Sequence, residues 1–511
     1  MDQQQLLKPI PSDKMSMFSK DELITLLRGE QDLRRQLEID NDRLRNLNEE
    51  LKQKRFYIEE QYVTLKNKFF GKSSEKQPSA EDKKKNLKKQ VKKKKKVQLP
   101  SQRYPEAPLI ERHIELETLP ECQCCSSKMS DSGMTENSEF LTVIPAQYIV
   151  IRQMRHKYRC EKCHGDIQTA PAPPKIKPGS GYSDEMVIDV ALSKYCDLIP
   201  IERYSSIAGR GGLMDLPPQS LIEQTHYLSD FLMGAYDLLG SEAKLEKVLH
   251  ADETPSRMLN KENAGKSWYL WGFSGKKTCY FEIHDTRSGD VASSILKNSK
   301  CEFLVSDVFS GYAKAVRVSN EYRKENDLPL IKNIYCNAHA RRKFKDSESK
   351  FPEESQDYLN IYGKIYRLNE MSKKWPDKTI RLCGYMKILF EKIKTQVMED
   401  IGGYSAKSSL GKAMSYFLKN YDSLTLFLEN PELPIDNNSQ ERLLRNPVIG
   451  RKTWYGNHSE RGAKTTAILF SLVESCKLNK VNPRKYFKKL VEDLHQGKPP
   501  YTPATYATNV G

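Results

Sequence analysis

The sequence contains no apolar run long enough to cross a membrane. Its richest apolar stretch, AILFSLV at 467–473, is far shorter than the ~18 residues that a membrane-spanning helix needs. The N-terminus, MDQQQLLKPIPSDK, lacks the basic segment followed by an apolar segment that marks a secretory signal. We therefore expect neither an integral membrane protein nor a secreted one, and the sequence favours a cytoplasmic location.

The chain contains few cysteines, and their number, eleven, is odd. An odd count without an export signal argues against a framework of disulfides. Five of the cysteines fall within residues 122–163. The other six are scattered and are typical of small buried hydrophobic residues: Cys196, Cys279, Cys301, Cys336, Cys383 and Cys476.

Acidic residues are fewer than basic ones, 67 against 83, which gives a formal net charge of +16. Residues 83–96, KKKNLKKQVKKKKK, hold ten of the lysines and no acid. As structure, this run is typical of a solvated linker. As chemistry, its lysines neutralise phosphates and bind polyanions without reading sequence. Nucleic acid is favoured over an anionic membrane surface, because no amphipathic anchor or lipidation signal accompanies the run.

Residues 20–68 are predicted to form one long polar helix. Apolar residues recur every seven positions and occupy position d of a heptad: Leu37, Leu44, Leu51, Ile58 and Leu65. Position a is mostly polar: Arg34, Asn41, Asn48, Arg55 and Tyr62. Sustained heptads favour a coiled coil, and asparagine at position a fixes a two-stranded register. The alternative is a single amphipathic helix that packs on its own chain.

Two CxxC pairs predict a structural zinc site. The four cysteines would complete a tetrahedral thiolate site with no open position: Cys122, Cys125, Cys160 and Cys163. Between the pairs, EFLTVIPAQYIVIRQMRHKYRC alternates like a hairpin that returns the second pair to the first. Cys124 and His164 are neighbours that could substitute as ligands. The alternative interpretation is a set of cysteines without metal.

Two aspartates lie where strands are expected to end. Asp252 is in HADET at 250–254, and Asp307 is in SDVFSGY at 306–312, which follows the apolar EFLV. Two carboxylates brought together repel, and Mg²⁺ or Mn²⁺ relieves this repulsion through hard oxygen ligands. Two such ions ~4 Å apart serve phosphoryl transfer. The alternative for each aspartate is a turn former or helix cap.

A third acid, Glu441, lies in PIDNNSQERLLRNPVIGRKTWYGNHSERGA at 434–463. It is expected in an early turn of a helix, as a metal-binding carboxylate beside phosphate-gripping basic residues: Arg442, Arg445, Arg451 and Lys452. The alternative is a surface salt bridge between Glu441 and Arg445, worth a few tenths of a kcal/mol. Spacing leaves Asp436 and Glu460 as rivals for the third acid.

The segment CNAHARRKFKD at 336–346 follows another expected strand, NIYC. His339 precedes Arg341, Arg342 and Lys343, which indicates contact with phosphate. A packed, hydrogen-bonded histidine is the alternative. Cys336 and His339 have metal-like spacing, but the sequence shows no obvious partner for them.

These motifs and the changes in composition divide the chain. We expect the following parts: a coiled-coil helix (1–71), a basic linker (72–104), a zinc-binding module (105–180), a helical DNA-binding or connecting region (181–246), a segment of short strands with the first two acids (247–345), a helical segment (346–430), a segment with the third acid (431–480) and a basic C-terminal tail (481–511).

Taken in order, the motifs resemble those of transposases of the insertion sequence sixty-six family, which are D-D-E transposases. The resemblance runs from about residue 20 to 500. It is carried by the leucine heptads that end in FFGKSSEK, the two CxxC pairs, LHADETP, SDVFSGY, CNAHARRKF, DNNSQERLLR, RKTWYGN and SLVESCKLNKVNP. Each motif alone is weak evidence for the family, but the order and spacing of all of them together are specific to it. The resemblance implies that 247–345 and 431–480 are the two parts of one core and that 346–430 is an insertion in it.

The resemblance implies a multidomain α/β protein: an N-terminal coiled-coil helix, a zinc-ribbon-like module and a ribonuclease-H-like mixed-sheet core with a helical insertion. Asp252, Asp307 and Glu441 match the family's three acids, which would hold two Mg²⁺ or Mn²⁺ ions, and the CxxC pairs match its segment for one structural zinc ion. Cys124, inside the first pair, departs from the pattern. The implied activity is metal-dependent DNA cleavage and strand transfer.

The partners implied are double-stranded DNA, as the terminal inverted repeats of a mobile element and its target, a second copy of the chain in a homodimer or higher oligomer, and accessory proteins of the same element. The location would be the bacterial cytoplasm, on the nucleoid when DNA is bound. DNA contacts are expected from ten residues: Lys92, Lys93, Lys94, His339, Arg341, Arg342, Arg442, Arg445, Arg451 and Lys452. A zinc-containing DNA-binding regulator without catalytic activity is the main alternative, and a coiled-coil architectural protein is a third.

Overall fold

A computed structural model describes the chain over residues 19–70, 99–105, 107–114, 118, 120–121, 123–124, 126–129, 138–142, 147–161, 167–259 and 267–510. The chain divides into two compact units. One comprises residues 1–71, 154–206 and 215–511, and the other comprises 72–153 and 207–214. No helix within the described residues combines the length and the apolar character needed to cross a membrane.

A mixed five-stranded sheet forms the centre of the larger unit. Its strands run in the order β5-β4-β3-β6-β7. β4 is antiparallel to both β3 and β5, whereas β6 is parallel to β3 and β7 is parallel to β6. The strands are β3 (Val248–Ser256), β4 (Trp268–Ser274), β5 (Cys279–His284), β6 (Phe303–Ser306) and β7 (Lys332–Tyr335). These match the short strands expected between 247 and 345.

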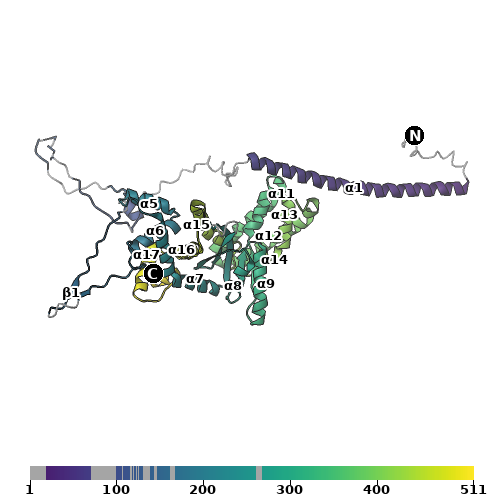
Figure 1. The fold of residues 1–511 in the computed structure, drawn as a ribbon. Helices are drawn as coiled ribbons and strands as arrows, with labels where there is room; N and C mark the ends of the chain where they lie inside the picture. Colours follow the sequence, from purple (N-terminus) through teal and green to yellow (C-terminus); the bar gives the residue numbers. More distant parts are fainter. Residues whose placement is uncertain are drawn as a thin grey trace. The chain divides into compact units, whose positions relative to one another are not determined.

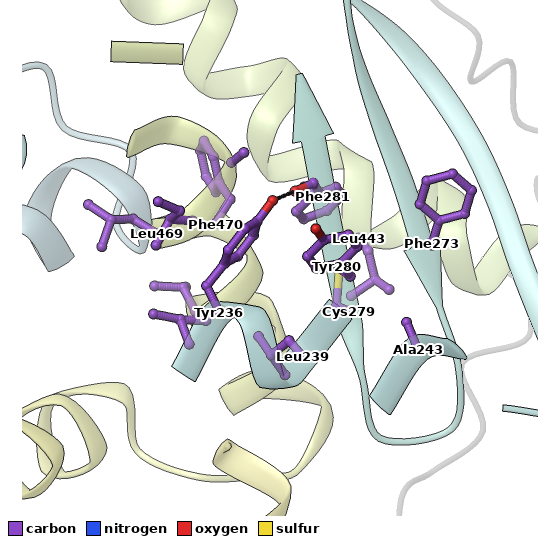
Figure 2. Close-up of a cluster of buried hydrophobic side chains, with 14 of the residues drawn as sticks. Tyr236, Leu239, Ala243, Phe273, Cys279, Tyr280, Phe281, Leu443, Leu469 and Phe470 are labelled. Carbon is purple, nitrogen blue, oxygen red and sulfur yellow. Dashed lines mark hydrogen bonds between the residues drawn. The ribbon is translucent and has the colours of Figure 1, made fainter. Parts of the chain in front are cut away.

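Helices cover the sheet and share one hydrophobic core with it. They are α7 (Met233–Leu245), α8 (Gly289–Leu296), α9 (Ser310–Glu325), α15 (Asn438–Trp454) and α16 (Glu460–Leu478). Figure 2 shows Leu239 of α7, Phe281 of β5 and Phe470 of α16 meeting in this core, and the Tyr236 hydroxyl donates to the Phe281 carbonyl at 2.8 Å. The tyrosine therefore buries its ring without leaving its hydroxyl unpaired.

The edge strand β5 is protected by side chains of α16. Ser471 Oγ accepts a hydrogen bond from Phe281 N at 2.8 Å, and Ser475 Oγ accepts one from Cys279 N at 3.0 Å. Ser475 Oγ also lies 3.0 Å from the Cys279 carbonyl oxygen. An unpaired strand edge is a site for pairing with other chains. Two serines one helical turn apart thus satisfy this edge from within the same chain.

Further helices lie on both sides of the sheet segment in the sequence. Before it are α4 (Asp184–Tyr195), α5 (Ile201–Arg210) and α6 (Pro218–Phe231); after it are α17 (Pro483–His495) and α18 (Pro503–Val510). The region 181–246, expected to be helical, is helical as predicted, with α4 to α7 as separate helices. Residues 481–511, expected as a basic tail, contain α17 and α18. Tyr486, Phe487 and Leu490 of α17 belong to the hydrophobic core.

The segment between β7 and α15 is helical and has a hydrophobic core of its own. It comprises α10 (Asn337–Ser347), α11 (Pro352–Lys374), η4 (Pro376–Lys378), α12 (Thr379–Asp400), η5 (Ile401–Gly403), α13 (Ser409–Lys419), α14 (Tyr421–Thr425) and η6 (Leu426–Leu428). Phe344, Tyr362, Phe390 and Phe417 form its aromatic centre, which also contacts β6 and β7. These green helices lie together in Figure 1.

The N-terminal helix α1 (Lys20–Phe70) matches the helix expected at 20–68. Of the predicted heptad seam, Leu37 is 48% exposed and Ile58 is 66% exposed. These apolar side chains are thus not buried against the rest of the chain.

The short helix α3 (Pro100–Arg103) precedes the first CxxC pair in the sequence. Near the second pair, β1 (Lys157–Arg159) pairs antiparallel with β2 (Ile167–Thr169). The sequence predicted a hairpin that runs from 139 to 160. Within the described residues 138–142 and 147–160, only 157–159 is a strand, so the hairpin lies later, around the second CxxC pair. Glu121 and Lys128 form an antiparallel bridge around the first pair.

Candidate active site

The parallel pairing of β3 and β6 brings the first two acids together. Val248 pairs with Phe303 and His250 with Val305. The same register, continued by two residues, places Asp252 beside Asp307, immediately after the end of β6. Neighbouring strands lie about 4.8 Å apart, so two carboxylates that are distant in sequence become neighbours. Asp307 also accepts a hydrogen bond from Phe309 N at 3.0 Å, which fixes the turn into α9.

Asn437 attaches the start of α15 to β3. Its Nδ2 donates to the Ala251 carbonyl at 2.9 Å, and its Oδ1 lies 2.8 Å from His250 Nδ1. Because an amide oxygen only accepts hydrogen bonds, His250 carries its proton on Nδ1. Burial lowers the pKa of His250, which keeps the ring neutral near pH 7. Glu441 follows one helical turn after Asn437 and accordingly lies close to the strand that carries Asp252.

The three acids interact electrostatically. Burial is the largest cause that raises the pKa of Asp252, from 3.8 to about 8, and the negative charges of Glu253, Asp307 and Glu441 add to it. The backbone N–H of Glu253 donates to Asp252 Oδ1 at 3.0 Å and acts in the opposite direction. Such a concentration of partly buried carboxylates is unfavourable until a cation neutralises it. Of the three candidates for the third acid, Glu441 is among the charges that raise the pKa of Asp252, and Asp436 and Glu460 are not.

The two rivals of Glu441 have other surroundings. Asp436 Oδ1 and Oδ2 accept hydrogen bonds from the backbone and side-chain nitrogens of Asn438, at 3.2 and 2.7 Å. Asp436 thereby stabilises the turn that opens α15. Glu460 is the exposed first residue of α16, where its charge favours the helix N-terminus.

Glu253 is an acid that reasoning from the sequence missed. Successive side chains of a strand point to opposite faces, so Glu253 lies on the face opposite to Asp252. Its side chain is 2% exposed and is paired with Arg287 at 2.6 Å, and it also accepts a hydrogen bond from the Tyr312 hydroxyl. The Arg287 guanidinium in turn lies 4.0 Å from the centre of the Phe309 ring. Glu253 therefore anchors β3 to α9 and to the loop before α8.

Gly272 permits the close approach of α15 to the sheet. It pairs with Asp252 across β3 and β4, and a Cβ atom at this position would lie 2.1 Å from Gln440 Nε2. Gln440 precedes Glu441 and is fully buried. The lone glycine inside the strand WYLWGFS was the available signal, since such glycines mark close approaches of other groups.

His339 and Arg342 of α10 face the third acid. His339 Nδ1 lies 3.7 Å from Glu441 Oε1, and Arg342 Nη2 lies 3.9 Å from Glu441 Oε2. Cys336 occupies the N-cap position of α10, and His339 lies three residues later, in the first turn of that helix. The segment CNAHARR therefore contributes directly to the surroundings of Glu441, although the helices α11–α14 separate the two in sequence.

Of the ten residues expected to contact DNA, five are exposed. They are Arg341, Arg342, Arg442, Arg445 and Lys452. Arg451 is half-buried, and its Nη1 donates to Thr254 Oγ1 at 3.3 Å. It is thus held against β3. Lys92, Lys93 and Lys94, with the whole lysine run at 83–96, lie outside the described residues.

The predicted zinc ligands are described only in part. Cys160 and the nearby Cys124 are exposed and form no disulfide. Cys122, Cys125, Cys163 and His164 lie outside the described residues. Cys160 directly follows β1, so the second CxxC pair lies between the antiparallel strands β1 and β2. The predicted four-thiolate set stays a prediction.

Comparison with known proteins identifies the family. The model of the transposase IS66 family matches residues 179–465, which is more than half of the chain. The chain belongs to the IS66 transposase family. A second model, the zinc-finger binding domain of transposase IS66, matches residues 120–164. The family implies a transposase that binds DNA, and the second match adds a zinc-binding domain around the two CxxC pairs.

Relatives of this IS66 protein occur in Sinorhizobium fredii. Uncharacterized protein y4hP is 25% identical over 402 residues, which cover 74% of this chain and 71% of the relative. Uncharacterized protein y4jD is 24% identical over 390 residues, which cover 74% and 75%. No solved structure matches the chain.

Proposed function

We propose that this IS66-family protein is a D-D-E transposase that cuts DNA at the ends of a mobile element and joins those ends to target DNA. The observation that carries the proposal is the convergence of Asp252, Asp307 and Glu441. Asp252 lies on β3, Asp307 directly follows the adjacent parallel strand β6, and the charges of Asp307 and Glu441 both raise the pKa of Asp252. The alternative, a DNA-binding regulator, has no need for this set.

The topology of the sheet supports a ribonuclease-H-like core. If the strands are counted along the chain from β3, their spatial order is 3-2-1-4-5, with the second strand antiparallel to the first. In this arrangement the first acid lies on the central strand and the second acid follows the adjacent fourth strand. The third acid arrives on a helix, after the helical insertion, and Asn437 attaches that helix to the central strand.

The three acids offer only hard oxygen ligands to a cation. Such a set suits Mg²⁺ or Mn²⁺, and the uncompensated negative charge around Asp252 fits this class of ion. We propose that Asp252, Asp307 and Glu441 hold two ions. When bound, these ions would supply activation of the attacking oxygen and stabilisation of the leaving oxygen in phosphoryl transfer.

The basic residues around the acids would position the DNA. The exposed Arg341, Arg342, Arg442, Arg445 and Lys452 can neutralise phosphates, and Arg451 is held next to β3 by Thr254. Contacts of this kind orient a duplex but do not read its bases. A scissile phosphate at the acids would first be hydrolysed by water. The freed 3′-hydroxyl would then attack a phosphodiester of the target.

The other parts of the chain would act in binding and assembly. We propose that one zinc ion, held by the cysteines of the two CxxC pairs, folds the module that recognises the terminal inverted repeats. We further propose that α1 pairs two protomers, since its leucine seam is exposed in the single chain. The lysine run would add affinity for any duplex.

The deciding experiment is a cleavage and joining assay with labelled terminal inverted repeats and Mg²⁺. Asp307→Asn should abolish both steps and leave the affinity for the ends nearly unchanged. Asp377→Asn, which alters an exposed carboxylate in η4, is the matched control and should remain active. Near-normal cleavage by the Asp307 variant would refute the proposal, and end binding without cleavage by the wild type would favour the regulator.

A further inference from the structure

A second group of metal-ligating atoms lies beside the three acids. Cys336 Sγ, one ring nitrogen of His339 and one carboxylate oxygen of Glu441 all lie within 4.8 Å of one another. Cys336 and His339 come from the N-terminus of α10, and Glu441 comes from the first turn of α15. The structure thus supplies the partner that the spacing of Cys336 and His339 lacked.

Two atoms of this group are buried without a hydrogen-bond partner. Among the described residues, His339 Nδ1 and Glu441 Oε1 are both enclosed and unpaired, although they face each other at 3.7 Å. That distance is too long for a hydrogen bond. Two ligands at about 2.0–2.2 Å from one tetrahedral ion are about 3.4 Å apart, so an ion between these atoms would satisfy both after a shift of a few tenths of an ångström.

The Cys336 side chain is a thiol that a coordinated ion would deprotonate. Burial raises its pKa to about 12, and a divalent ion bound to the sulfur would displace the proton. The sulfur accepts a hydrogen bond from the backbone nitrogen of Asn437 at 3.2 Å. It also lies at the N-terminus of α10, where the helix dipole stabilises negative charge. A thiolate and the Glu441 carboxylate carry two negative charges, which one divalent ion neutralises.

We propose that Cys336, His339 and Glu441 bind a second zinc ion, distinct from that of the CxxC module. The mixed sulfur, nitrogen and oxygen set selects a borderline ion such as Zn²⁺ over the hard Mg²⁺. Cys336 is fully buried, whereas the side chains of His339 and Glu441 are 28% and 25% exposed. These residues supply three ligands, which leaves the fourth position of a tetrahedral ion for water or for a phosphate oxygen of DNA.

This site goes beyond the proposed cleavage reaction but shares one residue with it. Glu441 has two carboxylate oxygens. Coordination of Oε1 by zinc would fix the orientation of the side chain. Oε2 would remain available to a Mg²⁺ ion held by Asp252 and Asp307. Zinc would thus hold the third acid in place, and the binding of zinc itself does not require Asp252 or Asp307.

The test is the zinc content of the full-length protein after saturation with Zn²⁺ and removal of the excess by gel filtration. Mass spectrometry of the metal should give about two ions per chain for the wild type, one for each site. His339→Gln and Cys336→Ser should each lose one ion. Cys476→Ser, which removes another buried thiol, is the matched control and should lose none.

Two further variants separate this site from the others. Cys160→Ser should lose only the ion of the CxxC module. Asp252→Asn should keep both ions, so a failure of the proposed cleavage chemistry does not affect this result. His339→Gln alters a partly exposed side chain, and its helix content by circular dichroism should equal that of the wild type. A folded His339→Gln protein that holds as much zinc as the wild type would overturn the proposal, whatever the CxxC module binds.

Discussion

Replacement of Asp252 by asparagine should stabilise the protein in magnesium-free buffer at pH 8. The folded chain holds the Asp252 carboxyl with a pKa of about 8, against 3.8 ordinarily. The unfolded chain loses this proton near pH 4, whereas the folded chain keeps it until about pH 8. Unfolding therefore releases a proton over this window, and stability falls as the pH rises through it. The uncharged asparagine carries no such penalty.

The size of the effect follows from the shift. Each pKa unit corresponds to 1.36 kcal/mol, so the difference between 3.8 and about 8 sets an upper bound of about 6 kcal/mol at pH 8. Relaxation and water around a charged carboxylate reduce such penalties, and we expect a gain of roughly 3 kcal/mol for Asp252→Asn. At pH 4 the two proteins should differ little, because the wild-type carboxyl is protonated when folded.

Urea denaturation followed by circular dichroism, at pH 4 to 8, measures this difference in the free energy of unfolding. Asp377→Asn controls for the loss of an exposed carboxylate and should show no such dependence. Addition of Mg²⁺ should stabilise the wild type selectively and narrow the gap, since a ligand of the folded state adds to its stability. An asparagine variant that is no more stable than the wild type at pH 8 would refute the reasoning.

Three further predictions concern other parts of the chain. Asn437→Asp places an oxygen against the Ala251 carbonyl in place of a donor and should cost about 1–3 kcal/mol in urea denaturation; an unchanged midpoint would contradict the role given to Asn437. Removal of residues 1–71 should convert the protein to a monomer in sedimentation, and a dimer of unchanged affinity would place the interface elsewhere. Replacement of the ten lysines at 83–96 by glutamine should weaken binding to all duplexes alike. If about six lysines contact DNA, the slope of log K against log[salt] should flatten by about 5, and a variant that lost its preference for element ends would show that the run reads sequence.

Local patterns were sufficient to predict the strands that carry Asp252 and Asp307, and both belong to one sheet. HADET was expected to close its strand, but β3 continues to Ser256 because its pairing with β4 extends that far, so Asp252 lies inside the strand and not at its end. The third acid needed more, because spacing alone left Asp436, Glu441 and Glu460 open. The choice among them depends on how α15 docks against β3, a contact between residues 186 positions apart.

Other features could not be found from local patterns. Glu253 is adjacent to Asp252, yet only the alternation of the strand and the positions of Arg287 and Tyr312 show that it belongs to the opposite face. The hairpin expected within 139–160 was misplaced, because alternating apolar residues there are exposed, and no partner strand lies among the described residues. Alternation indicates a strand only where a neighbour provides hydrogen bonds.

The serines of α16 that protect β5 have a consequence for synthesis on the ribosome. Phe281 and Ser471, which form one of these hydrogen bonds, are 190 residues apart. Translation proceeds at about 5–20 residues per second. After β5 leaves the ribosome, roughly 10–40 s therefore pass before Ser471 of α16 has been synthesised and can bond to this edge. During that interval the nascent chain presents an open strand edge and an uncovered apolar face. Premature termination before α16 should therefore yield an aggregating product and leave few truncated copies in solution.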